Sequence, residues 1–171
     1  NPAWKSRTFD GQRWRLGDTF NSSIGQYGFL VTPIQMLKAI AGVADYGIMS
    51  VPHVKLNDNN NSSKQSKIIS PINLTDMKIV REGMRMAVTG GTATYLNLAS
   101  VKIAAKSGTA QIGYGNTNTN SWIIGFFPYN KPKYAFAILM GDGPKNVSGN
   151  ATYVMRNIIK YMSANTPEYL K

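Results

Sequence analysis

The tetrapeptide Lys106-Ser107-Gly108-Thr109 has the residue types and spacing best suited to chemistry in this sequence. It follows small and apolar residues that predict a β-strand over Val101–Gln111. In a strand, Lys106 and Gly108 share one face, and the two hydroxyl residues share the other. A glycine lets another chain lie close against the backbone. A cation beside two hydroxyl groups suits a carboxylate or an acyl oxygen, so the pattern predicts a site for such a ligand.

The same tetrapeptide has a plainer interpretation. Short motifs occur by chance. A sheet strand that carries an exposed lysine and then a Ser-Gly turn signal would contain the same residues. The motif alone therefore does not decide between a binding site and an ordinary strand, and the surrounding elements have to decide it.

Composition indicates a folded domain or a large piece of one. The chain has 171 residues, of which 43% are hydrophobic and 16% charged, so it can build a packed core. No apolar run approaches the roughly 18 residues of a membrane span. The chain opens at Asn1-Pro2 without a signal peptide or an initiator methionine, which we interpret as a start inside a larger protein.

The net charge of +11 raises the possibility of a polyanionic partner such as nucleic acid. The basic residues are scattered, however, and they lack the interleaved aromatic residues of single-strand binders. The sequence has no cysteine and a single histidine, His53. Thiolate catalysis and the usual zinc ligand sets are therefore excluded, and we expect neither a metal nor a cofactor.

The first predicted helix follows a polar N-terminal stretch. Residues 1–20 are basic and rich in turn signals, which predicts irregular structure. Thr32-Pro33-Ile34-Gln35 then combines a capping residue, a proline at the first helical position and a capping-box glutamine. The helix should run to about Asp45 or Tyr46. Its apolar residues surround almost the whole circumference, which predicts a buried helix.

The second predicted helix is amphipathic. Thr75 is its expected cap, with Asp76 in the first turn. Apolar and charged residues alternate with helical spacing, which predicts an ordinary surface helix. The expected buried face consists of Met77, Val80, Met84, Ala87 and Val88. The expected solvent face consists of Lys78, Arg81, Glu82 and Arg85.

Two apolar strands are predicted after the motif, at Trp122–Phe127 and Tyr134–Met140, beyond a flexible loop over Gly113–Asn120. Short connections require an antiparallel meander, and we place the motif on an inner strand of it. The two later strands are apolar on both faces, so helices should cover both faces. Asn150 should cap a closing helix over Ala151–Met162. The predicted fold class is α/β (α+β), with an antiparallel sheet between helices.

The ordered set of motifs resembles the C-terminal part of the transpeptidase domain of class B penicillin-binding proteins. Ile103-Ala104-Ala105 ahead of Lys106 is similar to the elongation-specific branch, penicillin-binding protein 2. The matching stretches are Gly17-Asp18-Thr19, Ser23-Ile24-Gly25-Gln26, Thr32-Pro33-Ile34-Gln35-Met36, Gly91-Thr92-Ala93, Lys106-Ser107-Gly108-Thr109-Ala110-Gln111 and Phe126-Phe127-Pro128-Tyr129-Asn130.

One part of the family pattern is absent. The family uses a nucleophilic serine in Ser-x-x-Lys and a second motif, Ser-x-Asn. The sequence contains no Ser-x-x-Lys, and its two Ser-x-Asn tripeptides, at Ser148 and Ser163, follow Lys106 whereas the family places this motif before it. We interpret both as accidental. Residues 1–171 are therefore expected to be the C-terminal fragment of a single transpeptidase domain, inactive alone, with the first two motifs upstream.

The resemblance implies a mechanism and roles for the motif. In the family, the serine attacks a D-alanine carbonyl of a peptidoglycan stem peptide, and β-lactams acylate the same serine. Carried over, Lys106 supplies positive potential and takes part in proton transfer. The hydroxyl groups of Ser107 and Thr109 hold the substrate carboxylate, and Gly108 lets the peptide lie along the strand. The backbone N–H of Thr109 supplies half of an oxyanion hole.

The implied partners are stem peptides, β-lactams, the rest of the parent chain and the cell-elongation machinery, without nucleic acid. The implied location is the extracytoplasmic (periplasmic) face of the bacterial inner membrane, with an anchor upstream. Two other classes stay open: a β-lactam sensor domain of the same fold, which signals instead of crosslinking, and a basic nucleic-acid-binding module. The sequence upstream of residue 1 would distinguish the sensor from the transpeptidase. Salt-dependent binding of DNA would support the nucleic-acid-binding module.

Overall fold

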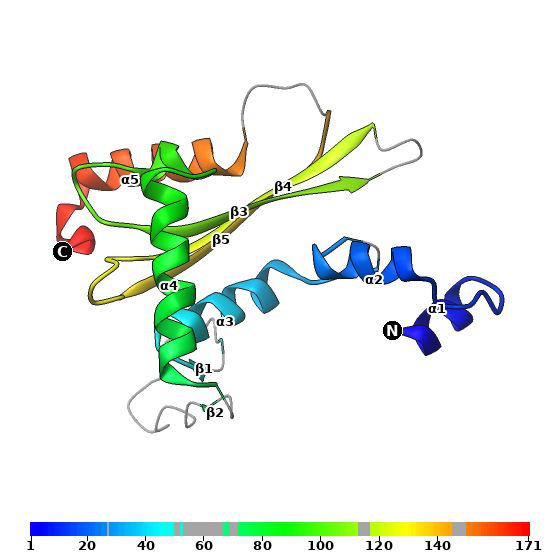
Figure 1. Cartoon of the computed structure of the whole chain (residues 1–171). Helices are drawn as coiled ribbons and strands as arrows, with labels where there is room; N and C mark the ends of the chain where they lie inside the picture. The colour runs from blue at the N-terminus through cyan, green and yellow to red at the C-terminus, as the bar shows by residue number, and fades with distance from the viewer. Residues whose placement is uncertain (27, 50–51, 53–66, 69–71, 113–116, 145–149) are drawn as a thin grey trace, which may run out of the picture. The chain divides into compact units, whose positions relative to one another are not determined.

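The computed structural model describes residues 1–26, 28–49, 52, 67–68, 72–112, 117–144 and 150–171 (Figure 1). The chain forms two compact units, Asn1–Val31 and Thr32–Lys171, and each is described by itself. Within the described residues, every helix is too short or too polar to cross a bilayer. His53 and most of the predicted polar loop at 57–67 lie outside the described residues.

The N-terminal unit contains two helices, α1 (Pro2–Thr8) and α2 (Leu16–Ser23). The prediction of irregular structure over residues 1–20 is therefore wrong. Local signals start α1: the side chain of Asn1 accepts a hydrogen bond from the Trp4 backbone N–H at 2.9 Å, and a proline occupies the first turn.

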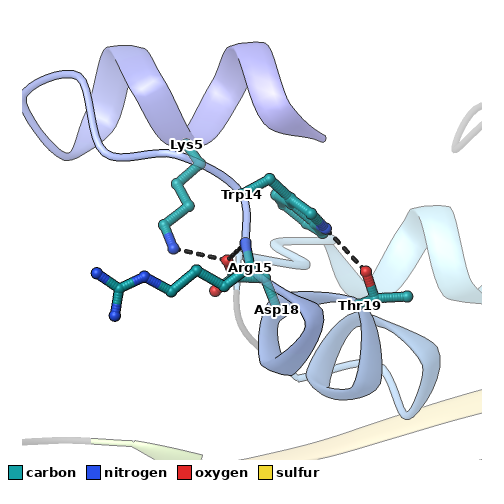
Figure 2. A network of polar contacts seen from close by, with 5 residues as sticks. All are labelled: Lys5, Trp14, Arg15, Asp18 and Thr19. Atoms are coloured by element: carbon teal, nitrogen blue, oxygen red, sulfur yellow. Dashed lines mark hydrogen bonds and ion pairs between the residues drawn. The ribbon is translucent and has the colours of Figure 1, made fainter.

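A buried ion pair joins the two helices of this unit (Figure 2). Lys5 Nζ lies 2.6 Å from Asp18 Oδ2, and both side chains are almost fully buried. The same carboxylate oxygen accepts the backbone N–H of Arg15 at 2.6 Å. The indole N–H of Trp14 donates to the hydroxyl of Thr19 at 2.8 Å. Asp18 thus caps the start of α2 and anchors α1 through Lys5.

The helix α3 (Pro33–Ala44) begins as predicted. The Thr32 side chain accepts the Gln35 backbone N–H at 3.3 Å, and the Gln35 side chain accepts the Thr32 backbone N–H at 2.8 Å. The prediction that the whole helix is buried is wrong, because Ile34 is 50% exposed, whereas Leu37, Ile40, Val43 and Ala44 pack in the cluster that includes Ala104 and Phe126 of the sheet. Residues 48–49 and 67–68 follow as a small antiparallel pair, β1 (Ile48–Met49) and β2 (Lys67–Ile68).

The helix α4 (Leu74–Thr89) differs from the prediction at its start and on its polar face. Its cap is Asn73, whose side chain accepts the Thr75 backbone N–H at 2.9 Å, so Thr75 is not the cap. Val80 is 48% exposed, whereas Arg81, predicted to face solvent, is only 3% exposed. The charged face of the helix is therefore partly buried.

The motif lies in a three-stranded antiparallel sheet of order β3-β4-β5 (Figure 1). A 3₁₀ turn, η1 (Thr94–Leu96), precedes β3 (Ala104–Ile112). The next strands are β4 (Asn118–Phe127) and β5 (Tyr134–Pro144), so residues 118–120, predicted as loop, belong to a strand. Among the described strands β3 has a neighbour on one side only, which contradicts the prediction of an inner strand.

Helices cover both faces of this sheet, as predicted. The closing helix α5 (Ala151–Asn165) is capped by Asn150, whose side chain accepts the Tyr153 backbone N–H at 3.1 Å, and a 3₁₀ turn, η3 (Pro167–Leu170), follows. Successive side chains along a strand point to opposite faces, so neighbouring residues at the start of β3 pack in two different hydrophobic clusters, one on each face of the sheet. Ile103 and Ala105 pack with α5, whereas Ala104 packs with α3. Residues of α4 contribute to both clusters.

Candidate active site

The tetrapeptide Lys106-Ser107-Gly108-Thr109 occupies the middle of β3. Lys106 and Thr109 are exposed, whereas Ser107 and Gly108 are half-buried. A methyl group on Gly108 would lie 3.5 Å from Trp122 Cβ, which is an ordinary contact. The described part of the chain therefore does not itself require glycine at this position, and any need for close approach arises from what lies against the strand.

The backbone of β3 has a defined orientation. The carbonyl of Lys102 accepts the Tyr129 backbone N–H at 2.8 Å, so residue 102 directs its polar backbone groups toward the β4 side. Backbone groups of successive residues in a strand point to opposite sides. Residues 103, 105, 107 and 109 therefore direct theirs to the outer edge of β3. Two side chains agree with this orientation, because Arg85 Nη1 donates to the carbonyl of Ile103 at 2.8 Å and Lys106 Nζ donates to the carbonyl of Ser107 at 2.5 Å.

Ser107 has a side-chain partner that sequence reasoning missed. Its hydroxyl lies 2.6 Å from the hydroxyl of Thr92, in the turn that follows α4. Either hydroxyl can be the donor, and the proton of the one that donates points at the oxygen of the other. Gly91-Thr92-Ala93 stood out in the sequence only as a family resemblance, and no role followed from it. The stretch itself was visible in the sequence. Its contact with the motif was not, because Thr92 and Ser107 are 15 positions apart.

Lys106 lies in a groove of about 580 Å³ between α4 and β3. Its wall is mostly apolar and consists of the last turns of α4 and the turn after them. The lining residues are Gly83, Met86, Ala87, Thr89, Gly90, Gly91, Thr92 and Lys106. A lysine in the wall of a concave, largely apolar surface suits a ligand that has an anionic group and an apolar body. Thr92 thus lines the groove and also bonds to the motif.

The two Ser-x-Asn tripeptides do not join this arrangement. Asn150 serves as the cap of α5. Asn165, at the end of the same helix, donates its side-chain amide to the Tyr161 carbonyl at 2.9 Å. Both asparagines are occupied in helix ends, in agreement with the interpretation from sequence. Within the described part of the chain, no group of three acidic, histidine or cysteine side chains gathers as a metal site would require.

The sequence matches a known family over most of its length. Residues 5–160 match the model of the penicillin binding protein transpeptidase domain. Peptidoglycan D,D-transpeptidase MrdA of Acinetobacter baumannii is 30% identical over 185 residues, which cover 94% of this chain and 26% of that protein. MrdA of Escherichia coli K12 is 34% identical over 164 residues, which cover 82% of this chain and 25% of that protein. The chain thus spans about a quarter of the length of these relatives.

Solved structures show the same fold. The complex between penicillin-binding protein 2 (PBP2) and MreC from Helicobacter pylori superposes with a TM-score of 0.75 at 31% identity, covering 97% of this chain and 31% of that one. Pseudomonas aeruginosa PBP2 in complex with WCK 5153 gives a TM-score of 0.71 at 26% identity, covering 100% of this chain and 38% of that one. The chain therefore belongs to the penicillin-binding protein transpeptidase domain family, in the class B branch that includes MrdA and PBP2.

Proposed function

We propose that this chain is part of a peptidoglycan D,D-transpeptidase that crosslinks stem peptides during cell-wall elongation. The arrangement of the motif at the outer edge of β3 is the observation that carries the proposal. There Lys106 lines a groove, and Ser107 is bonded to Thr92. The membership of the family and the names of the curated relatives support the reaction class.

In the proposed reaction the nucleophilic serine lies outside this chain. Its hydroxyl oxygen attacks the carbonyl carbon of the penultimate D-alanine, and the terminal D-alanine leaves as an amine that takes up a proton. An amine of a neighbouring stem peptide then attacks the acyl-enzyme, forms the crosslinking amide and releases the serine. A β-lactam acylates the same serine by opening its ring amide.

The chain supplies the wall that holds the substrate. Lys106 supplies positive potential near the substrate carboxylate and the migrating proton, and the hydroxyl groups of Ser107 and Thr109 bind the carboxylate. Gly108 allows the peptide backbone to lie along the strand. The Thr109 backbone N–H is directed to the outer edge of β3, the side required for half of an oxyanion hole. The 171 residues alone are inactive in this proposal, because no Ser-x-x-Lys is present.

Partners and location follow from the same proposal. A relative from Helicobacter pylori is known in a complex with MreC. We extend an interaction with elongation machinery to the protein that contains this chain, at the extracytoplasmic face of the inner membrane with an anchor upstream. A sensor of the same fold is disfavoured by the D,D-transpeptidase names of the curated relatives. A nucleic-acid-binding module is disfavoured by the match of residues 5–160 to the transpeptidase family.

A fluorescent penicillin tests the proposal. The longer protein should become covalently labelled, and the 171-residue chain alone should not. Lys106→Ala in the longer protein should slow acylation strongly, whereas Lys133→Ala, which removes an exposed lysine at the β4–β5 turn, should leave it unchanged. Labelling of the isolated chain would refute the assignment of the nucleophile, and a normal acylation rate in Lys106→Ala would refute the role of Lys106.

A further inference from the structure

Two arginines on α4 turn toward the protein rather than toward solvent. Arg81 and Arg85 are four residues apart and so share one face of the helix. Within the described residues, neither guanidinium has a carboxylate partner, and both donate to backbone carbonyls instead. A guanidinium whose N–H groups donate to backbone carbonyls fixes the position of the backbone at those carbonyls.

Arg85 holds the start of the motif strand directly. Its Nη1 donates to the carbonyl of Ile103 at 2.8 Å. Ile103 is fully buried and directly precedes β3, and its carbonyl points to the outer edge. Main-chain pairing secures β3 only on the β4 side of the described sheet. Arg85 therefore supplies on the outer side an anchor that the sheet ladder does not provide.

Arg81 secures the residues before β3 from the β4 side, through Tyr129. Its Nη2 donates to the carbonyl of Tyr129 at 3.0 Å, and the backbone N–H of Tyr129 donates to the carbonyl of Lys102 at 2.8 Å. Its Nη1 donates to the carbonyl of Ala44 and, at 3.4 Å, to that of Val43. These two carbonyls belong to the negative end of α3, where a cation is stabilised.

Aromatic rings keep the Arg81 guanidinium in place. Its Cζ lies 4.3 Å from the ring centre of Tyr46, 4.7 Å from that of Phe126 and 5.8 Å from that of Tyr129. Contacts of this kind are stronger when the cation is removed from water, and Arg81 is only 3% exposed. The guanidinium is thus a rigid junction between α3, α4 and the β4–β5 turn.

The same helix also determines the position of Thr92. Thr92 lies in the turn after α4, and its hydroxyl contacts that of Ser107 at 2.6 Å. A strand rises about 3.3 Å per residue, so Ser107 lies roughly 13 Å along β3 from Ile103. A slip of β3 against α4 by even a fraction of one residue would break the hydroxyl contact. The distance between Thr92 and the motif therefore depends on the anchor at the base of the strand.

We propose that Arg85, supported by Arg81, is a positioning residue of the active site. The two arginines clamp the base of β3 to α4, and so keep Lys106 and Ser107 aligned with Thr92 and with the substrate. The inference rests on the proposed function, because it assigns the arginines to the geometry of that site. They touch neither substrate nor reacting atoms, and they act only through the strand.

The test uses the longer protein and three variants on α4. Arg85→Met keeps the apolar stem but removes the donors, and Arg85→Lys keeps one cationic donor. Lys78→Met is the matched control, since Lys78 is exposed on the same helix. For each protein, acylation by a fluorescent penicillin is resolved into the dissociation constant before acylation and the acylation rate constant. Amide hydrogen exchange of residues 104–112 is measured in parallel by mass spectrometry.

We expect Arg85→Met to lower the acylation rate constant about tenfold, which corresponds to about 1.4 kcal/mol in the barrier, with little change in the dissociation constant. Arg85→Lys should recover part of the rate, and Lys78→Met should match the wild type. Exchange over β3 should be faster in Arg85→Met only. A merely structural role would instead reduce the fraction of active protein and leave the rate constant of the folded molecules unchanged.

The outcomes separate the two proposals. If the wild type is labelled and Arg85→Met is acylated at the same rate with unchanged exchange, the clamp is refuted and the proposed function stands. Loss of labelling in proportion to unfolded protein would also refute the clamp. If the wild type is not labelled, the proposed function fails and the catalytic part of this inference fails with it. Faster exchange of β3 in Arg85→Met would then support the anchor alone.

Discussion

Replacing Arg81 by methionine should destabilise the unit Thr32–Lys171 more than the same replacement of Arg85 or Lys78 on α4. Methionine keeps much of the buried apolar stem but removes every donor. Two carbonyls, those of Ala44 and Tyr129, would lose their close partner, and the carbonyl of Val43 would lose a longer contact. An acceptor left unpaired in a buried position costs about 1–3 kcal/mol.

The expected loss is about 3–5 kcal/mol in the free energy of unfolding. Two unpaired carbonyls supply about 2–6 kcal/mol. Loss of the cation–π contacts adds about 1 kcal/mol, and relief from burying a charge offsets part of the total. For a chain of this size, 1 kcal/mol shifts the melting temperature by about 2–4 °C, so the shift should be on the order of 10 °C.

Urea denaturation followed by far-ultraviolet circular dichroism measures this change. Arg85→Met removes one carbonyl bond from a half-buried residue and should cost about 1–2 kcal/mol. Lys78→Met removes an exposed cation and should be within about 0.5 kcal/mol of the wild type. The reasoning would be refuted if Arg81→Met were no more destabilised than Lys78→Met. It would also be refuted if Arg81→Ala differed from Arg81→Met by more than Arg81→Met differs from the wild type, because the stem would then be the main contributor.

Three further changes test other contacts. Gly125→Ala should lower the free energy of unfolding by about 2–3 kcal/mol in urea denaturation, because its Cβ would lie 2.6 Å from Phe136 Cζ. Thr92→Val in the longer protein should slow penicillin acylation, whereas Thr92→Ser, which keeps the hydroxyl bonded to Ser107, should preserve it; equal rates in both would refute the role of that contact. Asp18→Asn leaves its buried lysine partner without a carboxylate, so the N-terminal unit should lose about 3 kcal/mol, which tryptophan fluorescence during denaturation would detect.

Elements whose signals lie within a few residues could be predicted from the sequence. The start of α3 depends on Thr32 and Gln35, which are three positions apart, and both hydrogen bonds of the capping box are present. The cap of α5 at Asn150 is equally local. The cores of β4 and β5 were also predictable, because runs of apolar and aromatic residues mark them directly.

Features that depend on distant partners could not be predicted. Arg81 looks like a solvent-facing residue by helical periodicity, and only carbonyls 37 to 48 positions away make its burial favourable. Thr92 gains its role from Ser107, which the turn geometry brings close. Ile34 is apolar and yet exposed, the reverse of Arg81. The sequence pattern shows that this helix is apolar, but it does not show which of its turns pack against other elements.

The junction at Arg81 also has a consequence for the order in which the chain folds. The two hairpins of the β3-β4-β5 sheet join neighbouring segments, so these three strands pair across short loops. The bonds from Arg81 to Val43 and Ala44 close loops of 38 and 37 residues, and the bond to Tyr129 closes one of 48 residues. Closing these loops costs more chain entropy than closing the hairpins does. The three-stranded sheet should therefore assemble first, and α3 should join it later, when Arg81 binds the carbonyls of Val43 and Ala44.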